Sequence, residues 1–512
     1  MSTATSFSKL GYLMLKKEST AGTAVYPDQP VEILSESVVM NWDFTPANTI
    51  AGNRSANLRP IKNRVGPAAG TIEMLAEPNT IGHILCGLFG EDVITTLSAG
   101  VSVQHDFEPL NTLATYTMDV KVAGEDYVVR YFGVRFAKGT FALDENKLKC
   151  SFDIMAQKAF TNARVTTAAS SGTALLLDQT SGLIAGSDTI QILDEANLTT
   201  ENAELTVTTV TDENTLVVST IGASLAVDDV AVIKAQTITP EDYDLSNELV
   251  WAGGADVYIN AGANAMQNLS AKTNCESFEL TVENELEPRW AATGIDVVDR
   301  MPSDILLKGV TVSGKFSQFH INPDFLDKLR QNEQVGLRFN FFGNVLGVNS
   351  AETAEGTVES DGTGTVTVVV TAGADSANDY AIIVTQGTSA GAATATLTNK
   401  LIELVLSTTA GNNAVATIAT LLDGLSLVTA SAASTGNVTL ADNPDKIFFN
   451  TGRDANEREM LRFDLPDVRL MPFNANLSSD GIVEEEISFT AYRDENDDRE
   501  IFVRLRNDIA GY

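Results

Sequence analysis

The sequence predicts a mainly β protein of several domains, on three observations. Its 512 residues are too many for one ordinary hydrophobic core and correspond to roughly three or four domains. Hydrophobic residues make up 44% of the chain, enough to bury real cores, whereas aromatic residues make up only 7%. Thr, Val and Ala are abundant, and Gly occurs 37 times. This mixture of β-branched and turn-forming residues favours short strands joined by tight turns.

Two regions of the chain repeat one order of elements: a strand, a long polar loop, a second strand, a helix, and a pair of strands. In the first region they fall at residues 35–42, 45–65, 70–75, 78–85, and 134–136 with 148–154. In the second they fall at 275–282, 285–303, 314–319, 323–329, and 468–470 with 483–489. Chance likeness between β-hairpins is the alternative, but the whole order matches. We therefore expect two tandem β domains, each with a flanking helix.

Local patterns within the two regions support these elements. Apolar residues at positions 278, 280 and 282 alternate with Glu279, Thr281 and Glu283, which is the period of a half-buried strand. Each helix begins near a proline, Pro78 or Pro323, where the missing N–H costs nothing. In the closing strands, the Ser-Phe pair at 151–152 is matched with the Ser-Phe pair at 488–489.

Two further segments interrupt the repeated pattern. Residues 165–238 are rich in Thr and Val, and their strand-length runs between turn signals predict a small β-barrel of the SH3-like type. Residues 347–445 replace a short turn of the first region and are predicted to form strands around one helix near residues 413–422. Insertion at a hairpin tip is tolerated because the chain ends there lie close together. The expected domains are 1–164, 165–238, 239–346 completed by 446–512, and 347–445, with both inserts on the outside.

Charge and cysteine content limit the partners that we expect. The chain has 68 acidic and 34 basic residues, a formal net charge of −34. Such a surface repels nucleic acid, because DNA binding relies on Lys and Arg, yet an acidic channel would let DNA slide without sticking. Cys86, Cys150 and Cys275 are isolated, which fits a protein made in reducing cytosol. We expect no signal peptide in residues 1–17 and no segment that spans a bilayer.

No group of residues in the sequence predicts catalysis or a bound cofactor. Residues 387–391 match the G-x-S-x-G nucleophile motif, but hydrolases of that type need a later histidine. His83, His105 and His320 all precede Ser389, so a turn is the better interpretation. One histidine near each predicted helix falls short of a set of metal ligands. We expect no catalytic residues, no metal site and no cofactor.

Two acidic clusters also have a plain interpretation. Asp494, Asn496 and Asp498 place oxygens at alternate positions, as calcium loops do, but the glycine of the sharp turn and the bidentate glutamate are missing. A solvated hairpin turn fits better. Glu484 and Glu486 fall on the same side of a predicted strand, where two like charges indicate a wetted surface.

The two ends of the chain resemble those of siphophage tail tube proteins. The likeness is carried by residues 11–24 at the start and by residues 465–470, 487–491 and 503–507 at the end. It covers about residues 6–160 and 246–508 and leaves both inserts outside. The resemblance implies a β-sandwich-like domain with a flanking helix, six of which close a ring. Because this chain carries two such domains, it implies a trimer with pseudo-sixfold symmetry.

The resemblance also implies roles for particular segments. In the family a long loop and an N-terminal arm bridge stacked rings, and the matching segments here are 45–65, 285–303 and 2–30. The candidate ring-stacking residues are Arg54, Arg59, Lys62, Arg64, Arg289, Trp290 and Arg300. The candidate residues for the lumen face are Glu279, Thr281 and Glu283.

The implied partners are those of a phage tail. The chain would bind further copies of itself, with phage DNA and the tape measure protein in the lumen and the tail terminator and tail tip proteins at the ends. Its place would be the virion, after assembly in the host cytoplasm, with no membrane contact. The alternatives are another ring-forming tail protein, such as a terminator or a contractile inner tube, and a secreted adhesin or surface-layer protein built of β domains.

Replacing Arg54, Arg59 and Arg64 together with Ser should leave rings intact but abolish long tubes. These cations stand out in an acidic chain and are expected to pair with carboxylates of the next ring. Electron microscopy of the assembled protein measures the tube length. Unimpaired tube growth would contradict the stacking role.

Overall fold

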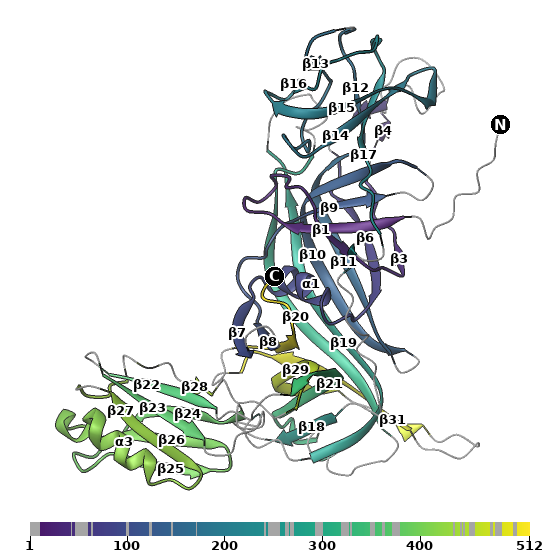
Figure 1. Ribbon diagram of the computed structural model, residues 1–512. Coiled ribbons are helices and arrows are strands. Elements are labelled where there is room, and N and C mark those ends of the chain that lie inside the picture. The colour runs from purple at the N-terminus through teal and green to yellow at the C-terminus, as the bar shows by residue number, and fades with distance from the viewer. Residues whose placement is uncertain are drawn as a thin grey trace.

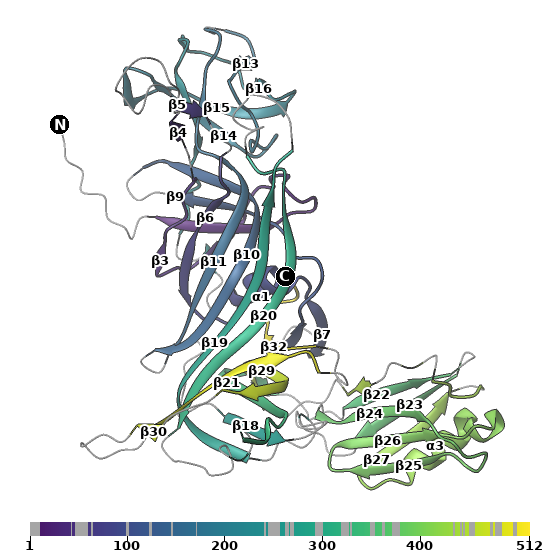
Figure 2. The same cartoon turned by 180° about the vertical axis from the view of Figure 1, so that it is seen from behind.

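The structure is a computed structural model (Figures 1 and 2). In the part of the chain that it describes, the protein is mainly β. The described residues are 11–41, 44–46, 60–62, 65–98, 102–121, 125–144, 147–169, 171–239, 242–243, 256–261, 266, 271–291, 301–318, 327, 330–348, 354–360, 364–370, 379–433, 436–440, 443, 446–449, 456–471, 475–476, 484–494 and 499–512. This agrees with the fold class that the composition predicts.

One antiparallel sheet runs through both repeated regions. In the first region its strand order is β3 (Ser35–Glu36), β6 (Ala68–Leu75), β11 (Lys147–Phe160) and β10 (Tyr127–Asp144). In the second region the order is β19 (Ala271–Arg289), β20 (Asp304–Gln318), β31 (Glu484–Tyr492) and β29 (Asn456–Leu470). Strand β10 pairs with β19, so the two sets of strands join end to end.

In each region, two more strands extend the pairing from the last of the four strands just named, which is β10 in the first region and β29 in the second. In the first, β9 (Tyr116–Lys121) pairs with β10 and with β1 (Tyr12–Lys17), which also pairs with β2 (Gln29–Val31). In the second, β21 (Val335–Val348) pairs with β29 and with β18 (Asp256–Ala261). In Figure 1, β1, β9 and helix α1 (Ile81–Phe89) lie in front of β10 and β11. The opposite side of the sheet faces the viewer in Figure 2, and neither insert lies in front of it.

The two regions share an irregularity at the same place in the strand pairing. The β10–β9 ladder shifts register between Tyr131 and Val134, and the β29–β21 ladder shifts between Leu465 and Val468. The flanking pairs are Tyr131–Met118 and Val134–Tyr116 in the first ladder, and Leu465–Leu337 and Val468–Val335 in the second. Because both ladders contain a bulge of the same size at this point, the two regions can be aligned residue by residue. The repeat seen in the sequence therefore has a counterpart in the strand pairing.

The pairing corrects one detail of the sequence-based alignment. Gly70 pairs with Ile154 in the first region, and Gly314 pairs with Phe489 in the second. At both glycines an added Cβ would lie 2.5 Å from a carbonyl oxygen of the preceding sheet strand, so both permit the same close approach. Ile154, and not Phe152, is thus the counterpart of Phe489. A shift by two residues keeps every side chain on its face, so alternation alone cannot detect it.

A single hydrophobic cluster runs through both regions. It contains buried residues of α1, of β6, β10 and β11, and of β19, β20, β29 and β31. The rings of Phe141 and Phe463 lie 4.9 Å apart and join the two halves. The helix expected in the first region is present as α1. In the second region Asp327, Arg330 and Gln331 are helical, and the other residues of the expected helix lie outside the described residues.

The end of the chain is tied to the first region. β32 (Phe502–Asn507) pairs with β29 and also with β8 (Ser102–Phe107), whose other neighbour is β7 (Val93–Ser98). The ring of Tyr512 lies against His83 and His105, with ring centroids 4.8 and 4.7 Å away. Strand pairing and ring contacts therefore fix the second region against the first.

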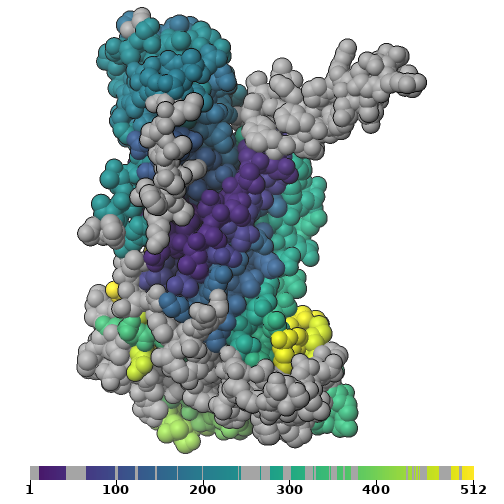
Figure 3. All heavy atoms as spheres, turned by 90° about the vertical axis from the view of Figure 1, so that its right-hand side faces the viewer, coloured from purple at the N-terminus to yellow at the C-terminus, as the bar shows by residue number. Residues whose placement is uncertain are grey.

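The first insert forms a compact group of strands, and it shares a hydrophobic cluster with Tyr12, Met14, Val128 and Phe160 of the first region. Strand β12 (Ala163–Arg164) leads into the insert, whose strands are β13 (Ala174–Leu176), β14 (Thr189–Asp194), β15 (Asn197–Val210), β16 (Thr215–Val218) and β17 (Val230–Lys234). They pair in the order β12, β17, β14, β15, β16, β13. A bridge between Val165 and Leu177 closes this order into a ring. Figure 3 shows this segment, in teal, above the N-terminal strands, in purple.

The second insert has two sheets and a separate hydrophobic cluster (Figure 1). One sheet has the order β22 (Glu355–Glu359), β23 (Thr365–Val370), β27 (Val428–Ala433). The other has the order β25 (Thr394–Thr398), β26 (Leu401–Leu406), β24 (Ala381–Gln386), β28 (Lys446–Phe448). Helix α3 (Val415–Asp423), which follows the 3-10 turn Ala410–Asn413, lies near the helix expected at 413–422. A small sheet, β4 (Phe44–Pro46) with β5 (Pro60–Lys62), stands apart in the first region.

Among the described residues, no helix is long and apolar enough to cross a membrane.

Replacing His83 with Gln should reduce the loss of stability at acidic pH. Burial lowers the pKa of His83 to about 4, from an ordinary value of 6.5. Between these values the unfolded chain binds a proton that the folded chain does not, so stability falls as the pH drops, by up to about 3 kcal/mol. Urea unfolding near neutral pH and at about pH 4.5 measures the difference. An equal acid-induced loss in both proteins would contradict the role of this histidine.

Candidate assembly surface

The seam between the two regions is an antiparallel ladder between β10 and β19. Its paired residues are Lys138–Glu283, Gly139–Val282, Thr140–Thr281, Phe141–Leu280 and Ala142–Glu279. The hydroxyl oxygens of Thr140 and Thr281 lie 3.4 Å apart across it. Below the seam, the side-chain amide of Asn284 donates to the carbonyls of Leu88 and Phe136, at 2.9 and 3.0 Å. Both main-chain and side-chain bonds therefore join the two regions.

The alternation predicted for β19 is present in the structure. Phe278, Leu280 and Val282 are at most 2% exposed and belong to the shared core. Glu279, Thr281 and Glu283, the candidate lumen residues, point to the opposite side and are accessible to solvent. Which side of the sheet faces a lumen depends on assembly and stays a prediction.

The solvent side of β6, β11, β10, β19, β20 and β31, here called the polar face, carries charges of both signs. Its basic residues are Arg135, Lys138, Lys147, Lys149, Arg289, Lys308 and Lys315. Its acidic residues are Glu73, Asp153, Glu279, Glu283, Glu285, Glu287, Asp304 and Glu486. The two signs are therefore nearly balanced among the described residues of this face, in contrast to the 68 acidic and 34 basic residues of the whole chain.

Ion pairs between neighbouring strands connect many of these charges. The ammonium of Lys315 lies 3.7 Å from Glu279 on one side and 3.8 Å from Glu486 on the other. Lys149 lies 3.5 Å from Glu73. Because cross-strand neighbours are held at fixed spacing, the register of the sheet decides which charges meet. The polar face is thus a ladder of paired charges.

The two ends of the joined sheet have open edges in the described part of the chain. β3 pairs with β6 alone, and β30 (Ala475–Asn476), which follows β29, pairs with β31 alone. By the alignment of the two regions, β3 corresponds to β19, and β29 with β30 corresponds to β10. These open edges therefore correspond to the two strands that meet at the seam.

The candidate ring-stacking residues are only partly described. Trp290 donates its indole N–H to the carbonyl of Val65, at 3.1 Å, which connects the loops of the two regions. Arg289 lies 3.0 Å from Glu287 on its own strand. Lys62 ends strand β5, but its side chain lies outside the described residues. Arg54, Arg59, Arg64 and Arg300 also lie outside them. The structure thus brings Trp290 to the first loop and leaves the stacking role a prediction.

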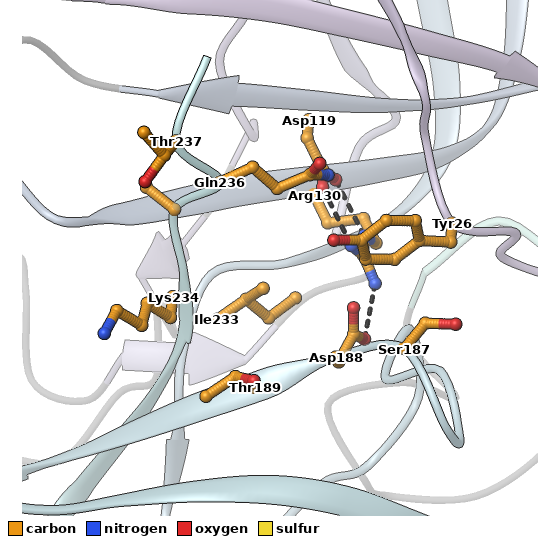
Figure 4. Close-up of a pocket in the computed structure, with 11 residues that line it drawn as sticks. Tyr26, Asp119, Arg130, Ser187, Asp188, Thr189, Ile233, Lys234, Gln236 and Thr237 are labelled. Atoms are coloured by element: carbon orange, nitrogen blue, oxygen red, sulfur yellow. Dashed lines mark hydrogen bonds and ion pairs between the residues drawn. The ribbon is translucent and has the colours of Figure 1, made fainter.

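A buried ionic cluster attaches the first insert to the first region (Figure 4). Arg130 on β10 binds both oxygens of Asp119 on β9, at 2.7 and 2.8 Å, and one oxygen of Asp188 in the insert, at 2.6 Å. It also donates to the carbonyl of Gly182, at 3.0 Å. Burial disfavours the charge of Arg130, but the two carboxylates outweigh this effect and raise its pKa above the ordinary value. A cavity of about 320 Å³ adjoins the cluster, and Tyr26 lines it.

A second buried cluster attaches the second insert to the second region. Arg338 on β21 binds Asp464 on β29, at 2.6 Å, and Asp379 of the insert, at 2.9 Å. Arg462 and Lys400 each reach Asp379 at 3.0 Å. Burial disfavours the charge of Arg338, but Asp379 and Asp464 outweigh it and raise its pKa.

The two clusters occupy one position of the repeat with the charges exchanged. Asp119 of β9 pairs with Arg130 of β10, whereas Arg338 of β21 pairs with Asp464 of β29. The shared bulge begins one residue further along in each ladder, at Tyr131 and at Leu465, so the positions are equivalent. In each case an aspartate of the insert binds the arginine. We call these groups the Arg130 clamp and the Arg338 clamp.

The described residues hold no grouping of His, Cys, Asp and Glu side chains that could bind a metal ion. Ser389 of the G-x-S-x-G match accepts the N–H of Gly391 at 3.1 Å, as a serine does in a local turn. His105 is engaged elsewhere, with Nδ1 2.9 Å from the Asp92 carboxylate and Nε2 3.0 Å from the carbonyl of Ile509.

Replacing Arg130 with Ala should destabilise the protein by about 3–5 kcal/mol, because it leaves Asp119 and Asp188 buried without their cation. The matched control is Lys16→Ala, which removes an exposed ion pair with Asp28 and should cost less than about 1 kcal/mol. Urea unfolding measures both changes, and limited proteolysis within 165–238 reports release of the insert. A loss no larger than that of the control would contradict the clamp.

A scan against models of protein families found no match to the sequence, and a search of curated proteins found none either.

Proposed function

We propose that this chain is the major tail tube protein of a long-tailed, non-contractile bacteriophage. Three copies would form a ring with pseudo-sixfold symmetry, and stacked rings would form the channel for DNA. The observation that supports this most is the seam between β10 and β19, because it joins two equivalent sheets edge to edge within one chain.

A head-to-tail contact of this kind can be repeated between chains. The open edge at β3 is equivalent to the edge that β19 offers at the seam, and the edge beyond β29 is equivalent to that of β10. Contact between unlike edges is heterologous, and it generates a ring when its rotation closes. Closure would pair both open edges, which otherwise invite aggregation. Three chains with two equivalent segments each would supply six wall segments.

The inner wall in this proposal is the polar face. Helix α1 and strands β1 and β9 cover the other side of the sheet, so the polar face is the side left free for a lumen (Figures 1 and 2). The inserts lie at the top and at the side of the sheet in these views, which fits a place on the outside of the tube. The partners expected from the resemblance, which are DNA, the tape measure protein and the proteins of the two tail ends, belong to this proposal.

Val38→Pro should abolish ring formation while leaving the protomer folded. The Val38 N–H bonds the Glu36 carboxylate at 3.0 Å and makes no bond to β6. Proline there removes a donor from the open edge and obstructs an approaching strand. Electron microscopy counts annuli, and their class averages should be threefold symmetric for the wild-type protein.

The matched control is Ser37→Pro. The Ser37 N–H donates to the carbonyl of Thr71 at 3.0 Å, inside the sheet, so this variant should lose stability as well as rings. Circular dichroism and urea unfolding separate the two effects. Wild-type rings from Val38→Pro, or wild-type protein without threefold annuli, would contradict the proposal.

A further inference from the structure

The chain distributes its charge unevenly between its parts. Acidic residues outnumber basic ones ten to one in residues 165–238, and again ten to one in residues 347–445. Together the two inserts therefore account for −18 of the formal net charge of −34. The polar face shows the opposite tendency, because basic residues nearly match acidic ones there. The excess of negative charge is thus carried to a large extent by the inserts.

The lysines of the polar face lie beside carboxylates of neighbouring strands. Lys315 lies between Glu279 and Glu486, within 3.8 Å of each. Lys149 is within 3.5 Å of Glu73. At the seam, Lys138 stands directly opposite Glu283 in the ladder. The same arrangement therefore occurs in the first region, in the second region and between them.

The pairing of lysines with carboxylates determines whether the polar face attracts or repels a polyanion. DNA binds to Lys and Arg because these cations release the counterions of its phosphates. A lysine whose charge is already neutralised by a carboxylate has less to offer a phosphate, while a wall with carboxylates alone would repel DNA over about 10 Å at moderate salt. The electric field of two opposite charges at cross-strand spacing extends over a shorter distance than the field of either charge alone.

We propose that the polar face is a charge-compensated surface past which duplex DNA moves with neither adhesion nor repulsion. This inference rests on the proposed function, which makes the polar face the channel wall. It differs from the acidic lining that the net charge of the chain suggests. The carboxylates of the polar face have a particular task here, which is to keep its lysines from holding DNA.

The test removes carboxylates without removing lysines. The triple variant Glu73→Gln, Glu279→Gln and Glu486→Gln leaves Lys149 and Lys315 without the carboxylates that lie beside them. The matched control Glu213→Gln, Glu355→Gln and Glu403→Gln makes the same change of net charge on exposed residues of the two inserts. Fluorescence anisotropy of a short labelled DNA duplex at low salt measures the affinity of single protomers and of assembled protein.

The triple variant of the polar face should bind the duplex at least about tenfold more tightly than the control, and added salt should abolish the gain. Equal affinities of the two variants would overturn the inference, and so would tight binding of DNA by the wild-type protein. The protomer assay does not need rings. Wild-type protein that forms no rings would therefore refute the tube, whereas rings with no gain in affinity would refute only charge compensation.

Discussion

The backbone ladder between β10 and β19 is the constraint on which the rest of the structure depends. A sheet edge presents unpaired N–H and C=O groups, and here each region satisfies one edge of the other. The ladder also fixes what lies on either side of it. It brings Phe141 against Phe463 in the shared core and Lys138 opposite Glu283 on the polar face. One register therefore sets the packing, the charge pairing and the direction in which a further copy would add.

The exchanged charges of the two clamps give each insert its own attachment. Asp188 meets an arginine on β10, whereas Asp379 meets arginines on β21 and β29. Each site therefore offers an arginine to the aspartate of its insert, but from a different strand of the repeat. A buried ion pair contributes little net stability compared with apolar packing, whereas removal of one partner leaves a buried charge without its counterion and is costly. Each clamp thus links its insert to its region through a buried charge that neither part can neutralise alone.

Much of the fold was predictable because it depends on local patterns. Alternation identified the buried and exposed sides of β19, and the order of elements revealed the repeat. The two-residue offset at Phe489 was not predictable, because a shift by two preserves alternation. The clamps were missed because they join distant parts of the sequence: Asp188 lies 58 residues from Arg130, and Asp464 lies 126 residues from Arg338. A signal existed: Arg130 and Arg338 each interrupt an apolar strand, and a charge inside such a run needs a buried partner.

The net charge of the chain does not describe the polar face. Net charge is a sum over all surfaces, and the two acidic inserts contribute −18 of the −34. A strand assigns its residues to two sides, so the charge of one side cannot be read from that sum. The face that would meet DNA has to be considered strand by strand, where Glu279 and Lys315 are direct partners in the ladder. A sheet suits such a wall because its register holds opposite charges at a fixed spacing, which a loop of the same composition would not do.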